Sequence, residues 1–218
     1  MRSLSAQKVA GIFGLIFVVL TLVGGFIAPF PPDPDEAPAK FLAYYARNRS
    51  ILLAQAVISL AGIIAVFPFV GGFWNKLRAA DGEGGILAIS AIAAFILTGA
   101  IATILSAWTG GLAMLANNGL DETNAKAFTF VFDFIGNGIY APLAAMSLSS
   151  GYLFVTKGGL PKWAGWLGIV LGVVQGVAIG EVATSGLFAP FGPLGLVSFI
   201  GFMLYTAIIS VHMLRGSD

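Results

Sequence analysis

Six long runs of apolar residues constrain this chain more than any other feature of its sequence. About 20 helical residues cross a hydrocarbon core of about 30 Å, and each run is long enough to do so. Only 10% of the residues are charged, whereas a soluble domain carries about 25%. The sequence therefore predicts an all-α polytopic membrane protein, a bundle of six transmembrane helices in one domain over residues 1–218. We expect these helices near residues 8–29, 50–73, 86–116, 122–156, 161–182 and 190–214.

The distribution of basic residues predicts the orientation, because Lys and Arg concentrate in cytoplasmic loops. If both termini are cytoplasmic, seven basic residues lie on the inner side and four on the outer side. We therefore expect a multi-pass protein of the inner (plasma) membrane, surrounded by the lipid bilayer. The inner residues are Arg2, Lys8, Lys76, Arg78, Lys157, Lys162 and Arg215, and the outer ones are Lys40, Arg47, Arg49 and Lys126.

The first outer loop, residues 30–49, combines a proline-rich segment with the amphipathic stretch AKFLAYYARNRS. Proline fixes φ and removes a donor, so the first part must be extended or turned. The second part predicts a short interfacial helix, with tyrosines in the headgroup layer and arginines near phosphates. A plain solvated linker is the alternative. The candidate ligand-binding residues of this loop are Tyr44, Tyr45, Arg47 and Arg49.

The predicted helices 86–116 and 122–156 are longer than a bilayer requires. A helix rises about 1.5 Å per residue, so each must tilt strongly or extend beyond the outer face. In the second case they would form one wall of an outer vestibule, roofed by the first loop.

A polar stripe lies in the segment FTFVFDFIGNGIYAP, residues 128–142. Asp133 and Asn137 share a helix face through their four-residue spacing, and Tyr140 continues it. Ionisable groups in a spanning helix are functional candidates because burying a charge in lipid costs at least about 2.5 kcal/mol. Pro142 also weakens the helix, since it leaves the carbonyl of Gly138 without a donor. The stripe is either structural or interfacial, or it contacts a ligand or ion.

Arg47, Arg49 and Lys126 are the expected partners of Asp133, together with tyrosine hydroxyls of the loop. Glu181, at the outer end of the predicted helix 161–182, is expected to be solvated. Intramembrane hydroxyls, among them Thr98, Ser106 and Ser147, are expected to bond to carbonyls of their own helices.

Four glycines recur every four residues in the predicted helix 161–182. Gly168, Gly172, Gly176 and Gly180 would form a ridge that a neighbouring helix can approach closely. Gln175 lies on nearly the same face, so we expect it to face protein, and it is a further candidate for ligand contact.

The sequence lacks the residues that several classes of function require. The chain contains no cysteine and one histidine, His212, so thiol chemistry and histidine metal clusters are excluded. We expect no metal, no cofactor and no catalytic residues. The scattered basic residues form no stripe for a nucleic acid.

The layout resembles that of uncharacterised six-span bacterial inner-membrane proteins of a domain-of-unknown-function type. The similar segments are LPKWAGWLG (160–168), YYARNRS, the turn WNKLRAADGEGG and the acid in FVFDF. That family has no established activity, so the resemblance implies a fold and no catalytic role.

Three functions are consistent with these features. The first is a non-enzymatic accessory or interaction subunit, or a binder of a lipid or apolar small ligand at the outer leaflet, with a membrane-protein partner or a second copy. The second is a small transporter or channel that uses the polar stripe. The third is a membrane enzyme acting on a lipid-soluble substrate near Asp133.

Overall fold

The computed structural model describes residues 5–82, 84–181, 186–189 and 192–216, and it confirms the all-helical prediction. No strand occurs within these residues. Arg2 and the predicted start of the last helix at residue 190 lie outside them. The helices are α1 (Ala6–Phe26), α2 (Pro38–Arg47), α3 (Arg49–Asp81), α4 (Ile86–Leu115), α5 (Glu122–Asn137), α6 (Tyr140–Thr156), α7 (Lys162–Ala178), the 3₁₀ turn η1 (Gly186–Phe188) and α8 (Pro193–Arg215).

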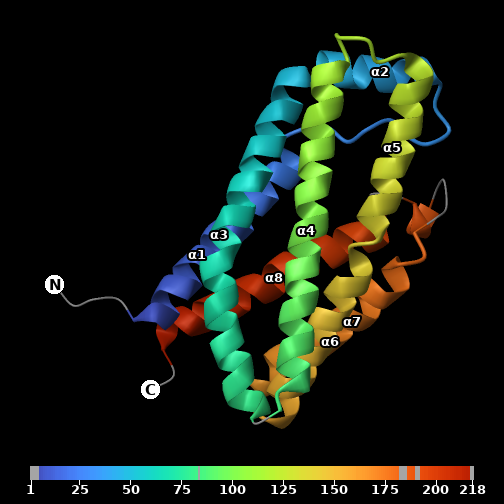
Figure 1. The fold of residues 1–218 in the computed structure, drawn as a ribbon. Helices are drawn as coiled ribbons and strands as arrows, with labels where there is room; N and C mark the ends of the chain where they lie inside the picture. The colour runs from blue at the N-terminus through green and yellow to red at the C-terminus, as the bar shows by residue number, and fades with distance from the viewer. Residues whose placement is uncertain (1–4, 83, 182–185, 190–191, 217–218) are drawn as a thin grey trace.

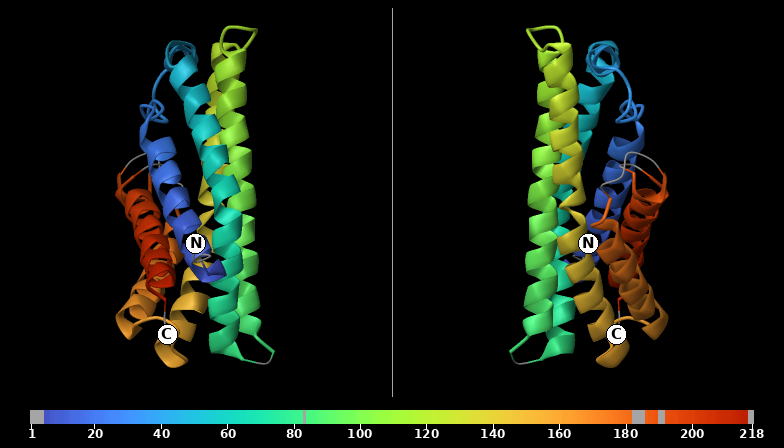
Figure 2. Two further views of the ribbon diagram at one scale, coloured as in Figure 1. Left: turned by 90° about the vertical axis from the view of Figure 1, so that its left-hand side faces the viewer. Right: turned by 90° about the vertical axis from the view of Figure 1, so that its right-hand side faces the viewer.

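The long helices pack in a closed ring. The order of contacts around the ring is α1, α3, α4, α6, α7 and α8, and α8 contacts α1 to close it. In Figure 1, α3 and α4 are the longest elements, and α5 continues the line of α6 upward beside α4. Figure 2 shows α1 and α8 on one side of the molecule and α3 and α4 on the other.

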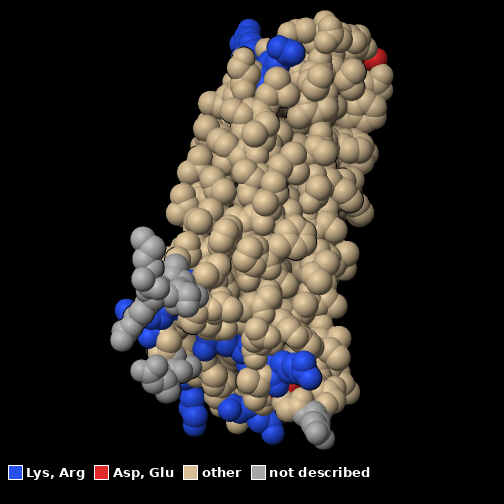
Figure 3. Space-filling model, turned by 60° about the vertical axis from the view of Figure 1, so that its left-hand side comes forward, with Lys and Arg blue, Asp and Glu red and all other residues tan. Residues whose placement is uncertain are grey.

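The outer surface of the ring is strongly apolar. Ile64, Phe67 and Phe134 are 73%, 67% and 72% exposed. Figure 3 shows Lys and Arg gathered at the two ends of one face, with an uncharged band between them. Within the described residues, five helical segments are long and apolar enough to cross a membrane, and α7 is a shorter apolar helix. An exposed apolar surface of this kind indicates a membrane-spanning protein.

A phenylalanine cluster fills the ring toward the end where the chain begins and ends. Phe69 and Phe73 of α3 stack with ring centroids 5.6 Å apart, and Phe95 of α4 lies 5.8 Å from Phe69. Phe17 of α1 and Phe202 of α8 close the group at 6.4 Å from each other. Tilted and edge-to-face pairs at these distances stabilise a core beyond their buried area.

The α6–α7 pair is held close by glycines on both helices. A Cβ at Gly151 would lie 2.7 Å from the Gly165 carbonyl oxygen and the Ile169 nitrogen, and one at Gly172 would lie 2.6 Å from Leu148. Gly168 lies equally close to Tyr205 of α8. Gly176 and Gly180, by contrast, are exposed. The four-residue spacing therefore marks a close contact at Gly168 and Gly172 and ends there.

The predicted helix 122–156 is divided in two. α5 ends at Asn137 and α6 begins at Tyr140, and the amide of Ile139 turns back to the carbonyl of Gly136. Pro142 has no N–H for the Gly138 carbonyl, which explains why the regular helix breaks here. Together α5 and α6 still form one apolar segment of 35 residues.

α2 forms a cap across the ends of α3, α4 and α5 (Figure 1). Phe41 and Tyr45 are buried in a second apolar cluster with Leu52 and Leu112. The Tyr45 hydroxyl is 2.9 Å from that of Thr129 on α5. Lys126 donates to the Glu36 carbonyl at 2.8 Å. The amphipathic face of α2 thus contacts protein, where the sequence predicted contact with the membrane interface.

Substitution of Gly151 by alanine is expected to destabilise the protein by about 1–3 kcal/mol, because the new methyl group must push two backbones apart. Gly176→Ala is the matched control, since a Cβ there meets no atom within 4 Å. The measurement is the thermal midpoint of unfolding in lipid nanodiscs. Equal midpoints for the two variants would contradict the close α6–α7 contact.

Alkaline pH is expected to loosen the α2 cap. Burial, with a smaller contribution from the charge of Asp133, raises the pKa of Tyr45 from 10.0 to about 12. A raised folded-state pKa gives stability that is complete below the unfolded pKa and is lost as pH rises through the folded pKa. The thermal midpoint should therefore fall between pH 10 and 12, and less steeply in Tyr45→Phe. Tyr152→Phe, at a side chain 53% exposed on α6, should keep the wild-type slope; an unchanged slope in Tyr45→Phe would contradict the account.

Candidate functional site

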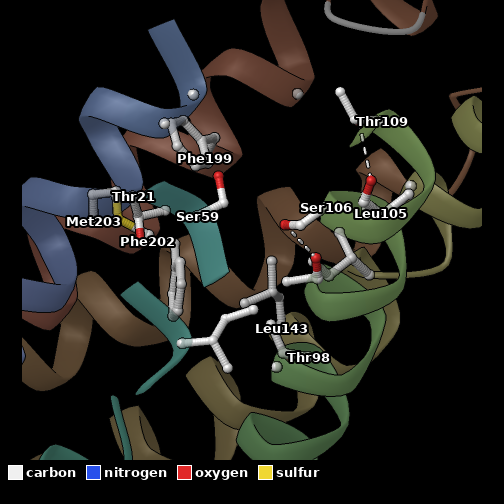
Figure 4. Close-up of a pocket in the computed structure, with 18 of the residues that line it drawn as sticks. Thr21, Ser59, Thr98, Leu105, Ser106, Thr109, Leu143, Phe199, Phe202 and Met203 are labelled. Atoms are coloured by element: carbon white, nitrogen blue, oxygen red, sulfur yellow. Dashed lines mark hydrogen bonds between the residues drawn. The ribbon is translucent and has the colours of Figure 1, made fainter. Parts of the chain in front are cut away.

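A cavity of about 320 Å³ lies inside the ring between the phenylalanine cluster and the α2 cap. The order of residues along α3 locates the cavity. Leu52 packs in the cap, residues between Gln55 and Val66 line the cavity, and Phe69 belongs to the phenylalanine cluster. Residues of α1, α4, α5, α6 and α8 complete its walls. Figure 4 shows side chains of α1, α3, α4, α6 and α8 around this space.

Most of the cavity wall is apolar, and three of its hydroxyl-bearing residues are apolar in effect. Thr98, Ser106 and Thr109 of α4 each donate to the carbonyl four residues back, at 2.8–3.0 Å, and Figure 4 shows the bond of Ser106 and that of Thr109 to Leu105. This confirms the expected back-bonding of Thr98 and Ser106, whereas the buried hydroxyl of Ser147, for which the same bond was expected, has no hydrogen-bond partner among the described groups. The three hydroxyls of α4 are satisfied within the helix, so they present little unmet polarity to a ligand.

One end of the cavity is polar, and the break between α5 and α6 builds it. Asp133, Asn137 and Tyr140 all line the cavity, so the structure brings together three of the sequence candidates. The side-chain amide of Asn137 donates to the backbone carbonyl of Glu181, which fixes the end of α7 against the break. We call Asp133, Asn137, Tyr140 and Glu181 the polar end.

Glu181 is the residue that sequence reasoning placed wrongly. It was expected to be solvated, yet it is 1% exposed and lines the cavity. A Cβ at Gly195 would lie 2.6 Å from the Tyr140 hydroxyl and 3.0 Å from both Glu181 carboxylate oxygens, so these groups meet over Gly195. The glycine of α8 leaves room for the carboxylate. The predicted helix 161–182 placed Glu181 at its outer end, whereas α7 ends at Ala178, and no feature of the sequence signals this early end.

Asp133 has none of the basic partners that the sequence suggested. The only ion pair among the described residues joins Lys40 to Glu36. Lys126 lies 5.6 Å and 5.5 Å from the ring centroids of Phe41 and Phe130 and points into the cap. The Oδ1 atom of Asp133 is buried and has no hydrogen-bond partner among the described groups.

The remaining candidates lie outside the cavity wall. Tyr44 donates to the carbonyl of Pro29 at 2.8 Å, and Tyr45 contacts Thr129, so both hold the cap. Arg47 is exposed and Arg49 is half-buried at the start of α3. Gln175 is fully buried on α7, as expected, but its amide atoms have no hydrogen-bond partner among the described groups.

The polar end offers carboxyl groups, an amide and a phenol facing an apolar space. Among the described residues, no group of three or more His, Cys, Asp or Glu side chains could hold a metal ion. The arrangement is suited to binding a molecule that is largely apolar and has one polar part.

Comparison of the chain with models of protein families, with curated proteins and with solved structures finds no match.

Proposed function

We propose that this chain is a six-span membrane protein that binds a small, largely apolar ligand in the cavity between the phenylalanine cluster and the α2 cap. The observation that carries the proposal is the cavity itself. Its volume of about 320 Å³ falls within the range of about 300–1,000 Å³ for small-molecule sites. Its wall is mostly apolar, with Thr21, Gln55 and Ser59 among the polar exceptions, and the polar end would fix the ligand's orientation.

The proposed topology places both termini on the cytoplasmic side and the α2 cap on the outer side. Lys76, Lys157 and Arg215 then lie at the cytoplasmic end, as the positive-inside rule favours. We include α7 among the spans, which brings their number to six, because it packs along α6 in the ring, although it has only 17 residues. In this topology the ligand site lies in the outer half of the membrane.

Binding is favoured over passage across the membrane by the aromatic core beneath the cavity. Phe69, Phe73 and Phe95 are between 0% and 3% exposed and fill the ring on the cytoplasmic side. A transport path would have to separate these rings, which would cost their packing. A cavity closed at one end serves a binding protein or an accessory subunit.

The test fills the cavity and follows binding of N-phenyl-1-naphthylamine, a neutral apolar fluorophore. A Cβ at Gly99, which lines the cavity, meets no atom within 4 Å. Gly99→Leu should therefore place its side chain in the ligand space and weaken probe binding at least about tenfold, or about 1.4 kcal/mol. Binding is measured by fluorescence titration in lipid nanodiscs, after subtraction of the signal from empty discs.

Gly71→Leu is the control, because Gly71 is exposed on α3 and a Cβ there also meets no atom within 4 Å. It should bind the probe as the wild-type protein does. Equal binding by wild type and Gly99→Leu, both with an unchanged thermal midpoint, would overturn the proposal.

A further inference from the structure

We infer that the cavity selects a lipophilic cation, an amine or quaternary ammonium attached to an apolar body. This inference rests on the proposed function and names the chemical class of the ligand. Three features of the cavity lead to it: the charges of its lining residues, its buried acceptors and its aromatic rings.

The charged residues that line the cavity are all acidic. Asp133 and Glu181 are among the lining residues, and no Lys, Arg or His is. The sequence extends this point, because it has no basic residue in 9–39, 50–75, 79–125, 127–156 or 163–211, the segments from which the wall is built. The chain therefore supplies no counter-charge from within these segments.

Both acids have an oxygen without a partner. Oε1 of Glu181 and Oδ1 of Asp133 are buried and have no hydrogen-bond partner among the described groups. Glu181 as a whole is 1% exposed, so water does not readily solvate it. Leaving a buried acceptor unsatisfied costs about 1–3 kcal/mol, and more for a charged group. A ligand with a positive charge or N–H donors would remove that cost.

Helix ends of both polarities meet at the polar end, because α6 begins at Tyr140 and α8 at Pro193, so the negative charge there comes from the two acids. α5 ends at Asn137 and α7 ends at Ala178, and the bond from Asn137 to the Glu181 carbonyl shows that the two ends meet. A helix C-terminus carries about −0.5 elementary charge. The N-terminus of α8 lies beside Glu181 through Gly195, where a helix N-terminus favours the ionised form of a carboxyl group.

Aromatic rings line the cavity together with the two acids. Phe132 precedes Asp133, Tyr140 lies against Glu181, and Phe199 of α8 lines the same cavity. The face of an aromatic ring attracts a cation by about 0.5–2 kcal/mol, while its apolar surface accommodates the rest of the molecule. The cavity thus combines acids and rings, as sites for organic ammonium ions do.

The test compares two ligands of the same shape, benzyltrimethylammonium and neopentylbenzene, in which a carbon replaces the charged nitrogen. Each displaces N-phenyl-1-naphthylamine from the protein in lipid nanodiscs. Glu181→Gln and Asp133→Asn keep the side-chain shape and remove the charge. Each should weaken binding of the ammonium at least about tenfold and change that of neopentylbenzene less than about twofold. Glu122→Gln, an exposed acid at the start of α5, should change neither.

The possible outcomes separate the two proposals. If the fluorophore binds and both variants weaken the two ligands equally or not at all, the cation inference is wrong and the apolar site stands. If cavity filling by Gly99→Leu does not reduce fluorophore binding, the site itself is wrong. The thermal midpoint of each variant is measured beside its binding. If Asp133→Asn is misfolded, Asp133→Glu, which keeps the charge, replaces it in the comparison and should bind the ammonium as the wild-type protein does.

Discussion

The carbonyl of Gly138 cannot accept a helical hydrogen bond, because the residue four positions on is Pro142, which has no N–H. Much of the structure depends on the helix break at this point. Before the break the segment packs against the α2 cap and α4 as α5, and after the break it packs between α4 and α7 as α6. Seven residues around the break, from Phe132 to Leu143, line the cavity or its polar end. A continuous helix would carry Asp133 and Tyr140 along one straight face, and the end of α7 would lose its contact with Asn137.

Two apolar clusters keep the space at the break from closing. The phenylalanine cluster supports one end of the ring, and the α2 cap joins α3, α4 and α5 at the other. Glycines bring α6 and α7 together, and the cavity lies among α1, α3, α4, α5, α6 and α8. Because the outer surface of the ring is apolar, the interior is the place where polar side chains can be concentrated, as in membrane proteins generally.

The sequence was sufficient for features that depend on one helix at a time. Length and hydropathy predicted the helices, and four-residue spacing placed Asp133 and Asn137 together. Features that depend on two or more helices were missed. The burial of Glu181 depends on where α7 ends and α8 begins. Lys126 lies in the cap because of the position of Phe41. The helices approach closely at Gly168 and Gly172, and not at Gly176, because of the way α6 and α7 cross.

The most direct test of an open, acidic cavity uses the absence of cysteine from the chain. A single cysteine at Ser106, inside the cavity, is compared with one at Leu97, which is 53% exposed on the outside of α4. Reaction with aminoethyl and sulfonatoethyl methanethiosulfonate is followed by mass spectrometry in lipid nanodiscs. The account predicts that the cysteine at 106 reacts faster than that at 97, and that the cationic reagent is favoured over the anionic one more strongly at 106. Equal rates at the two positions, or a preference for the anionic reagent at 106, would contradict it.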